Sequence, residues 1–335
     1  MTGPIRALLS PVRGSAGALA ITRARLLDYK PGNRGLIRYD IAPADGGTGW
    51  AVFGKIYAEP IQAARVHQIM GTLWADIFAG EPDLGVPQPL GCILDPPMLL
   101  YLPAIGRFLD ARTPSEQTIR YVSLAGRWLA TLHQRQLPLD RQLRLAAELV
   151  TLHAWVAAIG RTYSDQAGAA IQLFRYLQER AELLRLELRA PIHKDFHYGH
   201  LILDGRLNVI DFDEMRLGDP NFDLAHFCAN LYLLVYRRRR TFSSYQRLAR
   251  AFLGSYAGHT GWAPDERFVY FFVYTCLKIA WQLCAGYGPH PRPRGEEQRR
   301  QVQFILAQGL AALAQGSDAA TPAPWSSCAV SGGRQ

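Results

Sequence analysis

The dipeptide Asp204-Gly205 is the feature that most constrains the fold of this chain. It separates two short apolar runs, residues 201–203 and residues 207–210. Asp-Gly between such runs strongly predicts a tight β-hairpin, because both residues tolerate the left-handed backbone that the turn requires. A hairpin brings the segments before and after it to one end. We therefore expect Asp195, before the hairpin, to lie close to Asp211, after it.

Two carboxylates that converge in this way suit phosphoryl transfer. One accepts the proton of an attacking hydroxyl, and the other holds a divalent metal that bridges phosphate oxygens. Each motif taken singly has a simpler explanation. Acids after an apolar strand are usually solvated, and Asp219-Pro220 is a good helix start with Asp219 as N-cap. The order and spacing of all the motifs together favour the functional interpretation.

Residues 191–225 resemble the aminoglycoside phosphotransferase and choline kinase family, a branch of the protein-kinase-like fold. The family pattern is His-x-Asp-x-x-x-x-Asn, a hairpin, Ile-Asp-Phe, and then Gly-Asp-Pro-x-x-Asp-Leu-Ala. The chain matches this pattern at His193, Asp195, Ile210-Asp211-Phe212, Gly218-Asp219-Pro220 and Asp223-Leu224-Ala225. It departs from the pattern at His200, where the family has asparagine. The resemblance implies an α+β, bilobal fold with a small β-rich N-lobe and a larger, mostly helical C-lobe.

The resemblance also implies roles for individual residues. Asp195 would be the catalytic base, and His193 would orient its loop. Asp211 would bind Mg²⁺. Asp213 is either a second metal ligand or a solvated acid. His200 would contact Mg²⁺ directly, reach it through a water molecule, or donate a hydrogen bond to a phosphate.

The first hundred residues predict a small β-rich unit. Residues 25–29, 36–41 and 50–57 are strand candidates, and the turns between them give a three-stranded meander. Lys55 lies late in the third strand. A strand lysine often extends its stem along apolar surface, but the resemblance implies that Lys55 binds nucleotide phosphates. The turn between the first two strands would then lie over the phosphates, and Lys30, Gly32 and Arg34 in this turn would contribute to nucleotide binding.

Residues 60–78 have the apolar spacing of a helix. Kinase-like enzymes usually place a glutamate there to orient the lysine, and this segment has none up to residue 75. Gln68 is the nearest polar substitute. Residues 85–94 and 98–103 are further strand candidates, and the resemblance implies that the backbone of Leu100 and Leu102 binds the adenine edge.

The second lobe is predicted to be helical. Thr113-Pro114-Ser115-Glu116 reads as a capping box with Pro114 at the first helical position. Further helices are expected over residues 145–160, 167–188, 220–236, 245–256, 264–283 and 296–313, with a loop at 289–294. We divide the chain into an N-terminal extension (1–20), a nucleotide-binding lobe (21–103), a catalytic and substrate-binding lobe (104–315) and a disordered tail (316–335).

Composition limits the partners. Apolar residues make up 49% of the 335 positions and charged residues 19%, so the chain is not of disordered type. Five scattered cysteines suggest a reduced, cytoplasmic protein, and no apolar run is long enough for a membrane span. Residues 1–103 carry a net charge of +1 and the rest +8, without the interleaved aromatic residues of a nucleic-acid groove. The sequence does not indicate an oligomeric state.

We therefore expect an ATP- or GTP-dependent, Mg²⁺-dependent kinase that acts on a hydroxyl of a small molecule. The basic second lobe argues against cationic aminoglycosides as the acceptor. Three alternatives remain open. A zinc-dependent hydrolase could use an imidazole and carboxylate cluster from His193, Asp195, His197, His200, Asp211 and Asp213. A nucleotide-binding scaffold without catalysis and a protein kinase are the other two.

Overall fold

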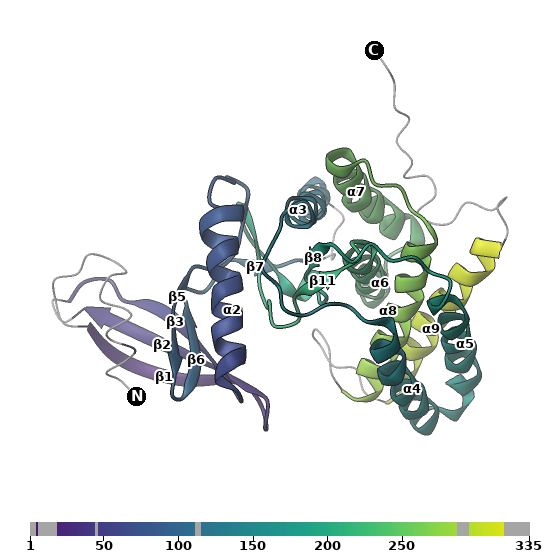
Figure 1. Cartoon of the computed structure of the whole chain (residues 1–335), viewed down its shortest axis with the longest axis horizontal. Coiled ribbons are helices and arrows are strands. Elements are labelled where there is room, and N and C mark those ends of the chain that lie inside the picture. Colours follow the sequence, from purple (N-terminus) through teal and green to yellow (C-terminus); the bar gives the residue numbers. More distant parts are fainter. Residues whose placement is uncertain (1–4, 6–18, 44–45, 111–114, 287–294, 318–335) are drawn as a thin grey trace, which may run out of the picture. The chain divides into compact units, whose positions relative to one another are not determined.

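The computed structural model describes residues 5, 19–43, 46–110, 115–286 and 295–317 (Figure 1). The chain forms two compact units. The first contains the residues up to Arg107 together with 202–213, and the second contains 108–201 and the residues from 214 onward. The predicted loop 289–294 and nearly all of the predicted extension and tail lie outside the described residues. The lobe boundaries at 103 and 104 stay a prediction; in the structure the hairpin, assigned above to the second lobe, packs with the first unit.

A five-stranded antiparallel sheet forms the body of the first unit. Its strand order is β1-β2-β3-β6-β5. The bounds are β1 Leu19–Lys30, β2 Arg34–Pro43, β3 Trp50–Tyr57, β5 Pro89–Leu94 and β6 Pro97–Tyr101. The predicted meander is confirmed, although β1 begins at Leu19 rather than at residue 25.

The alternation along β3 separates a core face from a functional face. Val52 belongs to the apolar cluster on one face of the sheet, with Tyr39 and Met98. Gly54 lies on that face too, where a Cβ would come within 2.8 Å of both the Met98 sulfur and the Tyr39 ring. Lys55 therefore faces the opposite side, because successive side chains of a strand alternate.

Helix α2, Pro60–Thr72, continues as a π-helical turn, Leu73–Ile77, which confirms the helix predicted over residues 60–78. It buries Ala63, Val66, Ile69 and Met70. Gln68 is exposed, so it does not have the buried position expected of a residue that orients Lys55.

The predicted hairpin is present. Strands β9, Leu201–Asp204, and β10, Arg206–Val209, are neighbours, and Gly205 between them has φ +67°. Strand β10 pairs in parallel with the short strand β4, Leu84–Gly85. The strand β7, Arg107–Phe108, ends the first part of the unit.

The second unit is mostly helical, as predicted. Its helices are α3 Glu116–His133, α4 Leu145–Thr162, α5 Ala167–Ala181, α6 Asn221–Arg237, α7 Phe242–Thr260, α8 Glu266–Cys284 and α9 Gly295–Ser317, with 3-10 turns at Ser164–Gln166 and Tyr198–His200. Strands β8, Ala190–Ile192, and β11, Arg216–Gly218, pair antiparallel. Helix α6 is buried along nearly its whole length, so it forms the centre of the unit.

Several helix ends differ from the predictions, and α7 begins at Phe242 and ends at Thr260 rather than at residues 245 and 256. Helix α5 ends at Ala181 rather than at residue 188. Helix α3 is capped by Ser115, whose side chain accepts a hydrogen bond from the Thr118 amide at 3.2 Å. The predicted cap at Thr113 and Pro114 lies outside the described residues.

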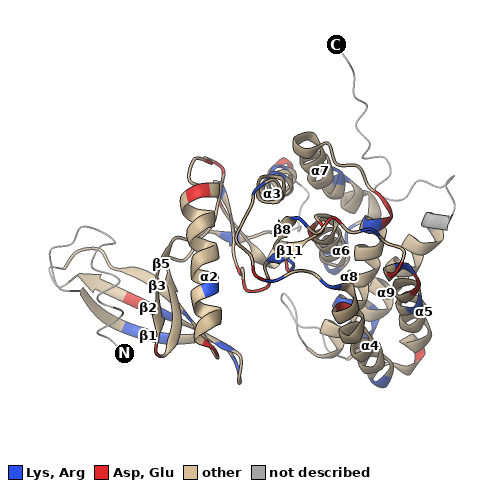
Figure 2. Ribbon diagram, in the orientation of Figure 1, with Lys and Arg blue, Asp and Glu red and all other residues tan. Residues whose placement is uncertain are grey.

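Charged residues are spread over the helices of the second unit. Figure 2 shows Lys and Arg interspersed with Asp and Glu on several helices of this unit. The run of four arginines at 237–240 ends α6, where cations interact favourably with the helix dipole. Within the parts of the chain that the structure describes, no helix is long and apolar enough to cross a membrane.

Candidate functional site

The first unit places two carboxylates directly after β10. Phe212 is buried and anchors this segment, with Asp211 and Asp213 on either side of it. Asp211 has φ +68°, in the left-handed region that a residue with a side chain enters at a cost of about 1–2 kcal/mol. Such a conformation persists only where the surroundings hold it, and it is frequent at functional sites.

Lys55 binds both carboxylates. Its Nζ lies 2.8 Å from Oδ1 of Asp211 and 2.8 Å from Oδ1 of Asp213. The Tyr57 hydroxyl donates to the same Asp213 oxygen at 2.8 Å. Lys55 and Tyr57 are two positions apart on β3, so they share one face of the sheet. The predicted site residues Lys55, Asp211 and Asp213 are thus brought together within one unit.

Arg34 adds a second cation from the start of β2. Its Nη2 lies 3.3 Å from Oδ2 of Asp211, and its Nη1 donates to Oδ2 of Asp213. Burial lowers the pKa of the Arg34 guanidinium, but the charges of Asp211 and Asp213 outweigh it and raise that pKa. Burial and the Asp213 charge also raise the pKa of Tyr57, so this phenol stays a hydrogen-bond donor.

The carboxylates of Asp211 and Asp213 fit a magnesium ion. Both carboxylates converge on one point, where the Lys55 ammonium lies. Carboxylate oxygens are the hard ligands that Mg²⁺ takes in proteins. Their contacts also answer a question left by the sequence. Lys55 has no glutamate partner in α2, and the two aspartates orient its side chain instead.

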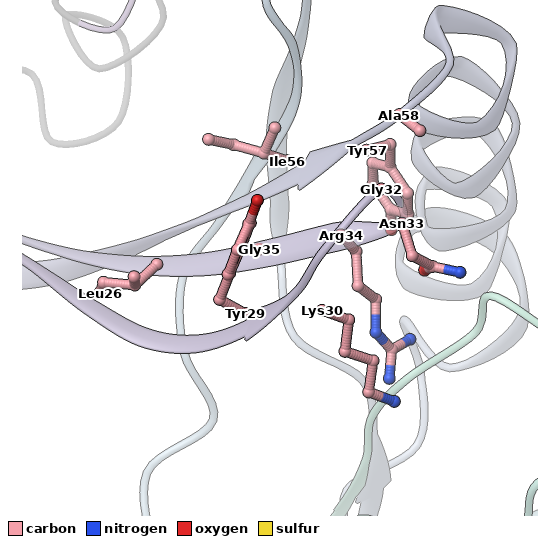
Figure 3. Close-up of a pocket in the computed structure, with 10 residues that line it drawn as sticks. All are labelled: Leu26, Tyr29, Lys30, Gly32, Asn33, Arg34, Gly35, Ile56, Tyr57 and Ala58. Carbon is pink, nitrogen blue, oxygen red and sulfur yellow. The ribbon is translucent and has the colours of Figure 1, made fainter.

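The turn between β1 and β2 borders a cavity of about 360 Å³ (Figure 3). Its lining includes the predicted nucleotide-binding residues Lys30, Gly32 and Arg34. Gly32 has φ +67°, which glycine adopts without steric penalty. The side chains of Lys30 and Arg34 extend from the turn in the same direction (Figure 3). Two cations beside a glycine turn suit an anionic ligand.

The proposed adenine contacts of Leu100 and Leu102 have less support. Leu100 is fully buried in β6, between β3 and β5. The Leu102 amide already donates to the Gln88 carbonyl at 2.9 Å. Tyr101 lies between them and stacks edge-on against Phe53, with ring centroids 5.8 Å apart. A base-binding role for Leu100 and Leu102 therefore stays a prediction.

The second unit surrounds Asp195 with nitrogen groups. Lys278 of α8 places its Nζ 2.8 Å from Oδ1 of Asp195, and His226 of α6 places its Nε2 3.4 Å from the same oxygen. On the other oxygen, His197 Nε2 lies at 3.7 Å and His200 Nδ1 at 3.9 Å. The Asp195 side chain remains 26% exposed, so a ligand can reach it.

These neighbours keep Asp195 ionised. Burial raises the pKa of the Asp195 carboxyl, but the Lys278 charge and the neighbouring imidazoles of His197 and His226 hold it well below its usual range. Burial and the Lys278 charge in turn lower the pKa of His226 to about 3, so His226 is neutral near pH 7.

The loop that carries Asp195 is fixed by Asp223 of α6. The Asp223 carboxylate accepts hydrogen bonds from the backbone amides of His193 at 2.6 Å and Lys194 at 2.8 Å, and it lies 3.2 Å from His133 Nε2. Asp223 thus ties α6 to the loop. The buried His193 accepts a hydrogen bond from the Asp195 amide at 3.3 Å, which supports its predicted role in orienting the loop.

Lys194 is held in a left-handed conformation, with φ +66°. Its Nζ lies 2.7 Å from Glu148 Oε1, and the Tyr274 hydroxyl donates to Glu148 Oε2 at 2.5 Å. Helices α4 and α8 therefore also hold the loop, through the Lys194 side chain.

Asp195, His197 and His200 are close enough to hold a metal ion, as the hydrolase alternative requires. Their hydrogen bonds argue against one. His197 Nδ1 accepts the Gly199 amide at 3.0 Å, so the neutral ring carries its proton on Nε2, the atom that faces Asp195. His200 Nδ1 donates to the Asp195 carbonyl at 2.8 Å, so this atom is not a metal ligand either. His200 therefore sits in the second unit's cluster, and its contact with a magnesium ion stays a prediction.

Sequence reasoning missed Lys278, His226 and Glu148. Only Lys278 left a usable signal, because it is a lone cation in the middle of a largely apolar helix. Asp195 and Asp211 belong to different units. Their expected convergence stays a prediction.

The sequence profile of the Phosphotransferase enzyme family matches residues 46–268, from β3 into α8. The chain belongs to this phosphotransferase family. The matched segment contains Lys55, Asp195, Asp211 and Asp223, so the family match includes both groups of site residues. No curated protein sequence matches this family member at a significant level.

Solved structures show that this family member has the protein-kinase-like fold. An amicoumacin kinase in complex with AMP-PNP, Ca²⁺ and Ami has a TM-score of 0.61 and 16% identity, over 92% of this chain and 95% of that one. A choline kinase from Cryptosporidium parvum Iowa II also has a TM-score of 0.61, at 11% identity, over 98% and 99% of the two chains. A spectinomycin phosphotransferase in complex with ADP and spectinomycin reaches 0.57, at 13% identity, over 92% and 98%.

Proposed function

We propose that the protein is an ATP- or GTP-dependent kinase that transfers the terminal phosphoryl group to a hydroxyl of a small molecule. The observation that carries this proposal is the convergence of Asp211 and Asp213 on Lys55 and Arg34 beside the glycine turn. Carboxylates for a metal and cations for phosphates are the parts that phosphoryl transfer uses. The nucleotides named in the amicoumacin kinase and spectinomycin phosphotransferase structures support the same proposal.

In this proposal the first unit binds the metal–nucleotide complex. Asp211 and Asp213 would hold a Mg²⁺ ion, whose positive charge would neutralise the negative charge that develops on the phosphates. Lys55 and Arg34 then interact with the phosphates as well as with the aspartates. Lys30 and the backbone of the turn at Gly32 bind the remaining phosphate oxygens.

The second unit supplies the base. The acceptor oxygen attacks the terminal phosphorus, the bond from that phosphorus to the bridging oxygen breaks, and the nucleoside diphosphate leaves. Asp195 takes the proton of the hydroxyl on its carboxylate. A weak base is adequate, because little proton transfer is needed in a loose transition state. His193 and Asp223 position the base.

Asp195→Asn tests the proposal. We expect its rate of ADP or GDP release, over a library of hydroxyl metabolites, to fall by about 10²–10⁴ from the wild-type rate. Nucleotide affinity, measured by calorimetry, should stay within a few-fold. Asp204→Asn is the matched control, because Asp204 is exposed in the hairpin turn and Asn-Gly keeps that turn.

Full turnover by Asp195→Asn would remove Asp195 from the mechanism. Nucleotide binding by the wild type without turnover over the whole library would instead favour a nucleotide-binding scaffold. Hydrolysis that depends on stoichiometric zinc would favour the hydrolase.

A further inference from the structure

One face of α8 leads away from Asp195. Tyr274, Lys278 and Trp281 are spaced four and three residues apart, so they lie on the same side of the helix. Lys278 contacts Asp195 at 2.8 Å, and Tyr274 contacts Glu148 of α4. The side chains of α8 that lie beside the proposed base are therefore found on this face.

A stacked tryptophan pair follows Lys278. Trp281 and Trp155 of α4 have ring centroids 4.6 Å apart and ring planes inclined by 13°. Tyr274 packs edge-on against Trp155, with centroids 6.2 Å apart. Both tryptophans are only half-buried. An aromatic surface that is partly exposed and lies one turn from Lys278 can bind the ring or apolar face of a ligand.

The polar groups around Asp195 favour an anion, because most of them can donate hydrogen bonds. Asp195 has one ammonium and three imidazoles within 4 Å, so nitrogen groups outnumber acceptors around it. Glu148, the neighbouring carboxylate, is paired with Lys194 at 2.7 Å, and Arg216 lies 3.7 Å from Glu148 and 2.7 Å from Glu214. A cationic ligand would have to displace these cations of the chain, whereas an anionic ligand would add an acceptor to them.

We propose that the acceptor is a hydroxyl compound that carries a carboxylate or phosphate group. Its hydroxyl meets Asp195, its anionic group binds the Lys278 ammonium, and its ring or carbon skeleton lies on Trp281. This inference rests on the proposed function, because it names the substrate class of the same site. It makes Lys278 a residue that determines specificity.

Matched compounds that differ only in charge test the acceptor class. One set is glucuronate, glucose and glucosamine, and the other is glycerol 3-phosphate, glycerol and 3-amino-1,2-propanediol. Binding to the full chain is followed by calorimetry, in the presence of Mg²⁺ and a non-hydrolysable ATP analogue, so that the readout does not depend on turnover. We expect the anionic member of at least one set to bind about tenfold more tightly than its neutral partner, as for a hydrogen bond to a charged group.

Lys278→Gln should remove that preference, while Arg250→Gln should keep it. Arg250 is an exposed residue of α7, so its variant removes one positive charge from the same unit without touching Asp195. Trp281→Ala should weaken the sugar set more than the glycerol set, because only the sugars offer a ring face.

The two proposals fail in different ways. Tighter binding of the cationic or neutral members, an anionic preference that survives in Lys278→Gln, or no binding of either anionic compound at millimolar concentration overturns the acceptor class. Preferential binding of an anionic member without ADP release when ATP replaces the analogue supports the acceptor class and contradicts the kinase.

Discussion

Lys55 shows how a side chain can be oriented by partners other than the expected glutamate. The family's usual helix glutamate is missing, and Asp211 and Asp213 hold the ammonium at 2.8 Å each. The same carboxylates are the proposed metal ligands. Lys55, Arg34 and a magnesium ion would therefore share two anionic groups, and nucleotide phosphates would supply the further negative charge that these cations need.

Lys55→Ala should raise the nucleotide KM about tenfold or more, because a charge-assisted contact to phosphate is lost. The acceptor KM should change little. Steady-state kinetics with each substrate varied in turn measures both values. If neither KM changes, the first unit does not bind phosphates as proposed.

His200 is the one position of the catalytic motif that departs from the family. Its ring contacts the Asp195 carbonyl at 2.8 Å, which suggests that it supports the loop. We expect His200→Asn to keep or improve turnover with Mg²⁺, and His200→Ala to lose activity moderately. Rates of the three proteins with Mg²⁺ and with Mn²⁺ provide the measurement. If the wild type needs Mn²⁺ and the His200→Asn variant works with Mg²⁺ instead, His200 is a direct metal ligand, since nitrogen suits the softer ion better.

At the scale of elements, the loop 193–200 is fixed from two sides. Asp223 of α6 binds its backbone, and Glu148 of α4 binds Lys194. Helix α6 in turn is the buried centre of the second unit. The geometry of the base thus depends on helix packing and not on the loop sequence alone.

Asp223→Ala should lower the free energy of unfolding by about 3 kcal/mol or more, because it leaves buried donors without an acceptor. Urea denaturation of this variant against Asp204→Asn gives the difference. A change below about 0.5 kcal/mol, the range of ordinary surface substitutions, would contradict the role assigned to Asp223.

At the scale of the whole molecule, the same contacts make the free energy of unfolding sensitive to acid. Burial raises the pKa values of Glu148 and Asp223, but Lys194 and His133 respectively outweigh burial, so both pKa values are lowered. The unfolded chain therefore binds more protons than the folded one. The contribution to stability is complete above the ordinary values of 4.5 and 3.8, and it is lost as the pH falls through the lower folded values.

The urea concentration at the midpoint of unfolding should decrease as the pH is lowered from 7 to 3. The variant Glu148→Gln, which cannot ionise at this position, should show a flatter acid limb. An identical limb in wild type and variant would show that Glu148 does not contribute to it.

How far the sequence predicts this molecule depends on how local each feature is. The hairpin at Asp204-Gly205 and the meander around Lys55 follow from short stretches of sequence, because turn chemistry and strand alternation act over a few residues. The partners of Asp195 do not follow. Lys278 and His226 reach Asp195, and Glu148 reaches the neighbouring Lys194, from three helices that are distant in sequence, and only packing brings these side chains together. The end of α5 was missed for a similar reason, since apolar spacing alone does not mark where packing stops.

The division into units has a consequence for protein synthesis. Residues 202–213 belong to the first unit, although residues 108–201 of the second unit separate them from the rest of it. A ribosome that has released residues 1–107 has made neither β10, which pairs with β4, nor the aspartates that bind Lys55 and Arg34. Domains generally fold in the order in which they emerge. Here the amino-terminal unit is completed only once Asp213 has left the ribosome, so its maturation is interleaved with the synthesis of its neighbour.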